Sequence, residues 1–202
     1  MRYLLTILAF LFSTSLFAAD PDSTFNVEIS DKLTYTFYIS YFDNSEVIRN
    51  VGFNEYSTSG IVLVENIRFQ EDDFVHYINF DDYNFDGYLD MYVHDPCMIL
   101  GNCHGKIYLF EKNRFSHDPQ FDDMTTVIAD PETKEIYSSN RSAAGSIFTN
   151  ETFKWQGGIL ILTERVSQNY DGDFYIYTVE ELAPDGTMKI TKQERLSEPR
   201  LD

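Results

Sequence analysis

The chain has 202 residues, of which 43% are hydrophobic and 16% aromatic, and its 33 Asp and Glu against 15 Lys and Arg give a formal net charge of −18 at pH 7. Nucleic-acid binding depends on Lys and Arg that neutralise phosphates, so this balance argues against nucleic acid as a partner and against a polyanionic surface as a substrate. A basic protein partner, in contrast, would be attracted electrostatically, with the gain mainly in association rate.

Residues 1–19 have the pattern of an export signal. Arg2 gives a short positive region, an almost unbroken apolar run follows, and small residues lead to Ala18 and Ala19, after either of which we expect cleavage. The apolar run is short for a membrane span, and an uncleaved N-terminal anchor is the alternative. Loss of Arg2 leaves 14 basic against 33 acidic residues, a mature net charge of −19. We expect residues 20–202 to form one periplasmic or secreted domain.

Period-two alternation runs through most of the chain and is clearest at Leu33–Tyr41, where every odd position is large and apolar or aromatic. No stretch keeps an amphipathic helical period for three turns. The sequence therefore predicts an all-β fold, with antiparallel sheets in a sandwich or propeller-like arrangement. Further strands are predicted at Ile61–Phe69, Phe74–Phe80, Leu89–Val93, Lys106–Phe110, Glu135–Ser139, Ser146–Trp155, Ile159–Arg165, Phe174–Leu182 and Thr187–Glu194.

Two hairpins follow from turn residues between these strands. Gln156-Gly157-Gly158 is expected to join one pair, and Pro184-Asp185-Gly186 the next pair, because Gly and Pro-Asp-Gly suit tight turns. Together they predict a four-stranded antiparallel meander near the C-terminus. The polar, acidic stretch Asn113–Thr125 is expected to be an irregular surface loop.

The segment Asp82–Asp90 matches D-x-N-x-D-G-x-x-D, the first nine positions of a calcium loop. Calcium takes six to eight hard oxygen ligands, and we expect side chains at positions 1, 3 and 5, the position 7 carbonyl, and position 9 to supply them. The predicted Ca²⁺ ligands are therefore Asp82, Asn84, Asp86, Tyr88 and Asp90. Flanking strands and a Val where an EF-hand has a bidentate Glu indicate the loop without the helix pair.

The alternative for this loop is an acidic β-turn that binds nothing. Its clustered Asp residues would repel one another without a cation, so we expect the metal also to stabilise the fold. The weaker echo Asp171-Gly172-Asp173 lacks preceding ligands at the right spacing and is interpreted as a turn, with a second calcium site as the alternative.

Cys97 and Cys103 enclose a short segment that contains Gly101. In an oxidising compartment this spacing suits a disulfide that closes a small loop. A metal site made with the flanking His94 and His104 is the alternative, and it requires free thiolates after export.

The segments Asn84–Asp90 and Phe153–Leu160, the latter with Trp155-Gln156-Gly157-Gly158, resemble a family of periplasmic calcium-binding β proteins. That family is related to lysozyme inhibitors and to immunity proteins that neutralise muramidase effectors of antibacterial secretion systems. The calcium loop alone is shared with FG-GAP-type propeller repeats, and the order of loop, aromatic strand and Trp-x-Gly-Gly hairpin spans residues 80–165. The resemblance implies an exported inhibitor or immunity-like protein that binds a cell-wall hydrolase. The Cys97–Cys103 segment is not part of the matching pattern.

The sequence offers little support for an enzyme. The four histidines show no i,i+4 pairing with Glu, and neither a G-x-S-x-G elbow nor a phosphate loop is present. The many acidic residues leave a glycoside hydrolase as a third hypothesis, although most of them are expected on a solvated surface. We therefore predict no catalytic residues. Trp155 could be a sugar platform, but a single Trp entering a tight hairpin is more often core.

An inhibitor needs a rigid loop that enters the target cleft, and Asn140–Ser146 is the best candidate. The predicted contact residues are Arg141, which could pair with catalytic carboxylates, and Ser142, Gly145 and Ser146, which add little bulk. An ordinary connection between strands is the alternative. The predicted partner is a cationic muramidase, and the competing function is a calcium-dependent carbohydrate- or surface-binding module of the envelope.

Overall fold

The computed structural model describes residues 22–43, 45–57, 60–70 and 73–201. The predicted export signal, residues 1–19, lies outside the described residues. Within these ranges no helix is long and apolar enough to cross a membrane.

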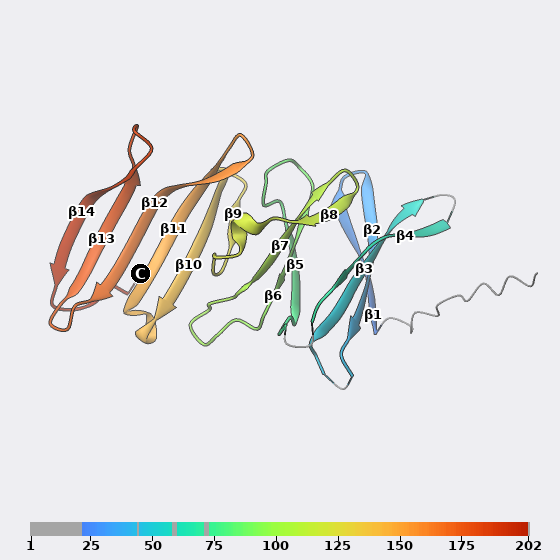
Figure 1. Ribbon diagram of the computed structural model, residues 1–202, viewed down its shortest axis with the longest axis horizontal. Coiled ribbons are helices and arrows are strands. Elements are labelled where there is room, and N and C mark those ends of the chain that lie inside the picture. The colour runs from blue at the N-terminus through green and yellow to red at the C-terminus, as the bar shows by residue number, and fades with distance from the viewer. Residues whose placement is uncertain (1–21, 44, 58–59, 71–72, 202) are drawn as a thin grey trace, which may run out of the picture.

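Three open antiparallel sheets follow one another along the long axis of the molecule (Figure 1). The N-terminal sheet has the order β1-β2-β3-β4, with strands β1 (Ser23–Ser30), β2 (Leu33–Tyr41), β3 (Ile48–Ser57) and β4 (Gly60–Arg68). The middle sheet has the order β5-β6-β7-β8, with strands β5 (Tyr77–Asp81), β6 (Asp90–His94), β7 (Gly105–Glu111) and β8 (Arg114–His117). The C-terminal sheet has the order β14-β13-β12-β11-β10-β9, with strands β9 (Ile128–Asp130), β10 (Glu135–Ser142), β11 (Ile147–Gln156), β12 (Ile159–Tyr170), β13 (Tyr175–Leu182) and β14 (Met188–Leu196).

The predicted all-β, antiparallel fold is confirmed, as are the strand at Leu33–Tyr41 and the C-terminal meander, which is β11 to β14. The first hairpin closes with Gln156 paired to Ile159. Its two central residues, Gly157 and Gly158, have φ of 60° and 83°. Two consecutive positive φ angles fit the right-handed twist of the flanking strands, and glycine adopts them without steric cost.

The prediction of an irregular surface loop at Asn113–Thr125 is wrong. The segment contains β8 and the short 3₁₀ helix η1 (Pro119–Phe121), and Phe115 and Phe121 are each only 1% exposed. Isolated aromatic side chains hold this polar segment against the two cores, and they carry no periodicity that a sequence pattern could reveal. Strands β1, β3 and β9 also escaped prediction.

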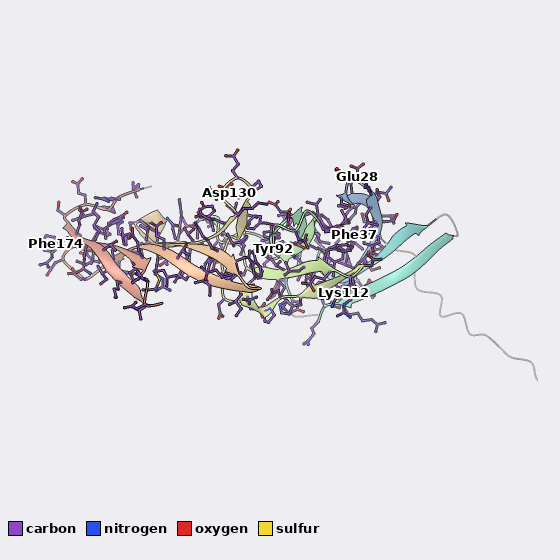
Figure 2. The ribbon with its side chains drawn as sticks, turned by 90° about the horizontal axis from the view of Figure 1, so that it is seen from above. Glu28, Phe37, Tyr92, Lys112, Asp130 and Phe174 are labelled. Carbon is purple, nitrogen blue, oxygen red and sulfur yellow. A yellow bond between two sulfur atoms is a disulfide. The ribbon has the colours of Figure 1, made fainter. Side chains whose placement is uncertain are left out.

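The two central strands of the middle sheet, β6 and β7, are buried on both faces, because alternate side chains of each enter different cores. Met91 and Val93 of β6 face a core shared with the N-terminal sheet, which includes Tyr35, Phe37 and Phe53. The neighbouring Tyr92 faces a second core, whose buried and partly buried members are Tyr83, Phe85, Tyr92, Ile107, Leu109, Phe121, Met124, Val127, Ala129, Ile136, Phe153, Trp155 and Leu160. Figure 2 shows Phe37 and Tyr92 among the densely packed side chains of this part of the molecule.

Candidate calcium loop and partner-binding edge

The candidate calcium loop joins β5 to β6 and is wound by its own side chains. The Asp82 carboxylate accepts hydrogen bonds from the backbone N–H groups of Asp86 (3.0 Å) and Gly87 (2.9 Å). Asn84 Oδ1 accepts from the same Asp86 N–H (3.0 Å), and Asp86 Oδ1 accepts from Tyr88 N–H (2.9 Å). Gly87 has φ of 90°, a left-handed conformation that glycine adopts without steric cost. The sequence D-x-N-x-D-G thus produces a tight coil with three polar side chains turned inward.

The donor set of this coil fits a hard cation. Asp82, Asn84 and Asp86 supply side-chain oxygens at alternate positions, the arrangement that calcium loops use. An ionised carboxylate has about four lone-pair sites, so the bonds to backbone amides leave acceptors free for a metal. The Asn84 amide also lies 3.2 Å from Asp86 Oδ2. Asp82 and Asn84 both accept the Asp86 N–H, and the Asn84 amide contacts the Asp86 carboxylate, so these three predicted ligands lie side by side in the coil.

Asp90 occupies a different environment, because its carboxylate is fully buried and points toward backbone amides. Its Oδ2 accepts from Tyr83 N–H (2.8 Å) and Asn84 N–H (3.3 Å), and its Oδ1 accepts from Phe110 N–H on β7 (2.7 Å). Burial raises the pKa of Asp90 to about 7, and the negative charges of Asp86 and Asp82 add to this shift. Asp82, Asp86 and Asp90 do not form a group of carboxylate oxygens all within 4.8 Å of one another. Asp90 therefore stabilises the loop from its buried side, by accepting hydrogen bonds from backbone N–H groups of the loop and of β7.

The loop also bridges the three sheets. Leu89 N–H donates to Ile29 O of β1 (2.8 Å), and the Trp155 indole Nε1 of β11 donates to Tyr83 O (2.8 Å). Figure 1 shows the β5–β6 connection at the upper edge of the molecule, beside the β1–β2 and β7–β8 turns. Trp155 is half-buried against the second core, as expected for a structural Trp. Anything that orders the loop therefore acts on contacts between all three sheets.

Two grooves of about 570 and 500 Å³ flank the outer side of the loop. Both are lined by Lys32, Asp86 and Tyr88, whose ring is 41% exposed. The Tyr88 ring lies 5.6 Å from the Phe110 ring, between centroids. An exposed aromatic ring beside a carboxylate and an ammonium group offers contacts suited to a polar ligand.

The predicted disulfide between Cys97 and Cys103 is confirmed, and it closes the β6–β7 connection. The alternative metal site is not supported, because both sulfurs are bonded to each other. His94 is also occupied: its Nε2 is 2.9 Å from Asn79 Nδ2, and its Nδ1 is 2.7 Å from Asp95 O.

The predicted partner loop is shorter than expected. Asn140, Arg141 and Ser142 belong to strand β10, and the connection to β11 is the tight turn η2 (Ala143–Gly145) followed by Ser146. The prediction that Asn140–Ser146 is a loop is therefore wrong for its first three residues, whose backbone pairs with β11. The three residues of η2 all have positive φ, from 47° to 88°. We call Ala143–Ser146 the β10–β11 tip.

Two side chains that sequence reasoning missed hold Arg141 and the tip in place. Asn102, in the disulfide loop, donates to Arg141 O (2.7 Å) and accepts from Arg141 N–H (2.9 Å). Gln168 of β12 is fully buried and donates to Ser146 O (2.8 Å) and to Arg200 O (3.2 Å). A lone Asn or Gln gives no sequence signal, because its partners lie 22 to 39 residues away in the chain.

Comparison with known proteins gives similarity at the level of the fold. No family model and no curated protein matches the sequence. A solved structure from Xanthomonas, described as a protein related to a type IV secretion system, matches with a TM-score of 0.54 and 16% identity over 84% of this chain and 98% of that one.

Two proteins from Bacteroides uniformis and Bacteroides fragilis, described as candidate 6-phosphogluconolactonases, match with TM-scores of 0.36 and 0.34 and 13% identity. The matches cover 86% and 89% of this chain but only 55% and 59% of those proteins.

Proposed function

We propose that this protein is an exported, calcium-binding inhibitor or immunity-like protein that binds a cell-wall hydrolase of the muramidase class. The observation that carries the proposal is the β10–β11 tip with Arg141 beside it, held by Asn102 and Gln168 and presented by a strongly acidic chain. A rigid projecting segment loses little conformational entropy when it enters a cleft. The disulfide supports export, because such bonds persist in oxidising compartments. The fold shared with a protein related to a secretion system agrees with an envelope setting.

The charge supports a muramidase as partner. Enzymes that act on an anionic wall gain from positive charge, and an acidic inhibitor complements them. Their catalytic centres, however, carry paired carboxylates. Arg141, on the half-buried end of β10, would meet such carboxylates once the tip enters the cleft. Ser142, Gly145 and Ser146 would let the two backbones approach closely.

Inhibition is tested with the mature protein and a panel of muramidases, including any encoded beside its gene. We expect inhibition at stoichiometric excess, while purified peptidoglycan alone stays intact. Arg141→Glu should weaken inhibition, because it places a like charge against an acidic cleft, whereas Arg114→Glu, which changes an exposed arginine of β8, should not. If no muramidase responds to the wild type, the proposal fails; if both variants inhibit equally well, Arg141 is not a contact.

Calcium binding is the second part of the proposal, with Asp82, Asn84, Asp86 and the Tyr88 carbonyl as the residues that would hold the ion. Calcium should raise the melting temperature, because a ligand bound by the folded state alone stabilises it by mass action. Asp86→Ala should abolish the shift, and Asp171→Ala, in the similar Asp-Gly turn before β13, should keep it. Asp171 Oδ1 accepts from Asp173 and Phe174 N–H groups, as expected for a plain turn. If titration calorimetry detects no heat of binding at millimolar calcium, the proposed calcium site is excluded.

The grooves beside the calcium loop favour one other function, a calcium-dependent carbohydrate- or surface-binding module. Tyr88 and Lys32 would contact the sugar, and calcium would order Asp86 between them. Calcium-dependent retention on purified peptidoglycan, lost in Tyr88→Ala and kept in Tyr170→Ala, another exposed tyrosine, would support this function. Retention that ignores EDTA would exclude it.

A further inference from the structure

The disulfide loop Pro96–Cys103 projects from the same edge of the molecule as the β10–β11 tip. Figure 1 shows the β6–β7 and β10–β11 connections at the lower edge, opposite the candidate calcium loop. The loop exposes two apolar side chains: Met98 is 65% exposed and Ile99 is fully exposed. Gly101 N–H donates to Met98 O (2.7 Å), and Met98 N–H donates to Asn102 O (2.9 Å), which forms a tight turn with Ile99 at its apex. Both side chains are therefore exposed on a turn whose backbone is fixed by the disulfide and by these two hydrogen bonds.

Hydrogen bonds join this loop to the partner-binding residues. Asn102 makes two bonds to the Arg141 backbone, so the loop and the end of β10 share one polar connection. Thr126 adds a second anchor: its hydroxyl donates to Gly101 O (2.7 Å) and accepts from Cys103 N–H (3.1 Å). Its own N–H donates to Cys103 O (2.8 Å). The loop and the tip are therefore parts of one rigid edge.

The disulfide loop and the end of β10 with its tip differ in charge from the rest of the chain. Pro96–Cys103 contains no charged side chain, and Asn140–Ser146 contains only Arg141, in a protein with a net charge of −18. Charged residues are depleted at the centres of protein interfaces, whereas Met and Arg are enriched. An acidic segment would be repelled by the catalytic carboxylates of a glycoside hydrolase, whereas two uncharged segments with one arginine would not.

We propose that Met98 and Ile99 on the disulfide loop form, with Arg141, one continuous surface that occupies the substrate cleft of the target hydrolase. This inference rests on the proposed function and adds the apolar half of its binding site. Arg141 pairs with the carboxylates at the centre of the cleft, and Ile99 and Met98 pack against its apolar sugar-binding walls. The disulfide keeps the two side chains exposed before binding, which lowers the entropy lost on association.

The test compares the double variant Met98→Asp/Ile99→Asp with Ile190→Asp, which changes an isoleucine on β14 that is 57% exposed and distant from this edge in the sheet order. We expect the double variant to raise the inhibition constant by roughly tenfold or more, mainly through faster dissociation. Ile190→Asp should leave the constant unchanged. Both variants should keep the wild-type melting temperature, because the altered side chains are exposed.

A second variant, Cys97→Ser/Cys103→Ser, separates the contribution of the loop's rigidity from that of the overall charge of the protein. It should speed dissociation, while the salt dependence of association, which reflects the charge of the whole molecule, stays as in the wild type. If the wild type inhibits and the double aspartate variant inhibits equally well, the inference is overturned and the proposed function stands. If the wild type binds no muramidase, both are overturned.

Discussion

The middle sheet and the outer strands of the C-terminal sheet are built from similar alternating sequences but are stabilised in different ways. All five residues of β6 are buried, whereas most of β14 is exposed. The outer strands rely on interactions between long side chains: Arg195 stacks on Phe174 at 3.9 Å, and Arg200 on Tyr177 at 4.1 Å, from guanidinium carbon to ring centroid. Figure 2 places Phe174 at the end of the molecule opposite Phe37. Burial on both faces thus stabilises the central strands of the middle sheet, whereas contacts between long side chains stabilise the outer strands of the C-terminal sheet.

This difference in burial means that the two regions contribute differently to the candidate functional segments. The candidate calcium loop and the disulfide loop lie at opposite ends of β6, so both candidate segments depend on the most buried strand. Gln168 is the exception in the outer region, since it is fully buried beneath the C-terminal tail and supports Ser146. The stability of these two loops should therefore depend on the middle sheet far more than on β13 and β14.

The largest expected effect is that of Asp90→Ala. The change leaves the buried N–H groups of Tyr83 and Phe110, and the partly buried N–H of Asn84, without their acceptor. Each unsatisfied buried group costs about 1–3 kcal/mol, so a loss of about 2–6 kcal/mol in the free energy of unfolding is expected. Asp185→Ala, in the exposed β13–β14 turn, should shift the melting temperature only slightly. Chemical denaturation of both variants measures the contrast. Equal losses would mean that the two regions are equally sensitive.

Truncation of one isoleucine in each region should give the next largest difference. Ile107→Ala removes a fully buried side chain of β7 and should cost about 2–5 kcal/mol, because a cavity remains. Ile190→Ala on β14, where the side chain is 57% exposed, should change the unfolding free energy by less than about 0.5 kcal/mol. A similar cost at both positions would contradict the comparison.

The pH dependence of stability should come from the middle sheet. Burial raises the pKa of Asp90 to about 7 from its ordinary value of 3.8, so the folded state binds more protons than the unfolded state between these values. In EDTA, stability should therefore rise as the pH falls from 8 to 5, by at most about 1.4 kcal/mol per pH unit from this group. Asp95, whose pKa burial also raises, acts in the same direction.

Asp90→Asn removes this titration and should flatten the dependence of melting temperature on pH. Calcium should flatten it as well, because a nearby cation favours the ionised carboxylate. A slope that persists in both cases would place the titrating group elsewhere.

The smallest effect is expected for the ion-pair row across the outer strands. Arg165 Nε lies 2.8 Å from Glu151 Oε1, and Nη1 lies 3.5 Å from Glu180 Oε2, but the arginine side chain is 37% exposed. Because solvent screens such pairs, Arg165→Met should cost no more than about 1 kcal/mol. A loss as large as that of Ile107→Ala would show that ion pairs, and not burial, dominate the outer region.

The sequence predicted those parts of the structure that depend on residues close together in the chain. The alternation at Leu33–Tyr41, the Gly157-Gly158 turn and the cysteine spacing each specify their own geometry. The role of Asp90 could not be predicted in this way, because its partner Phe110 is twenty residues away and binds through its backbone. The connection between the disulfide loop and β10 was missed for the same reason, since Asn102 recognises the Arg141 main chain and no side chain. The calcium ligand set itself stays a prediction.

The bond between Trp155 and the Tyr83 carbonyl has a practical consequence, because Trp155 is the only tryptophan in the chain. Its indole N–H ends on the second residue of the candidate calcium loop, and its ring lies 6.1 Å from that of Phe121, between centroids, in the second core. The tryptophan fluorescence of the unmodified protein therefore comes from the point where the loop, the middle sheet and the C-terminal sheet meet. Its emission maximum gives an optical signal for the state of this junction without an added label.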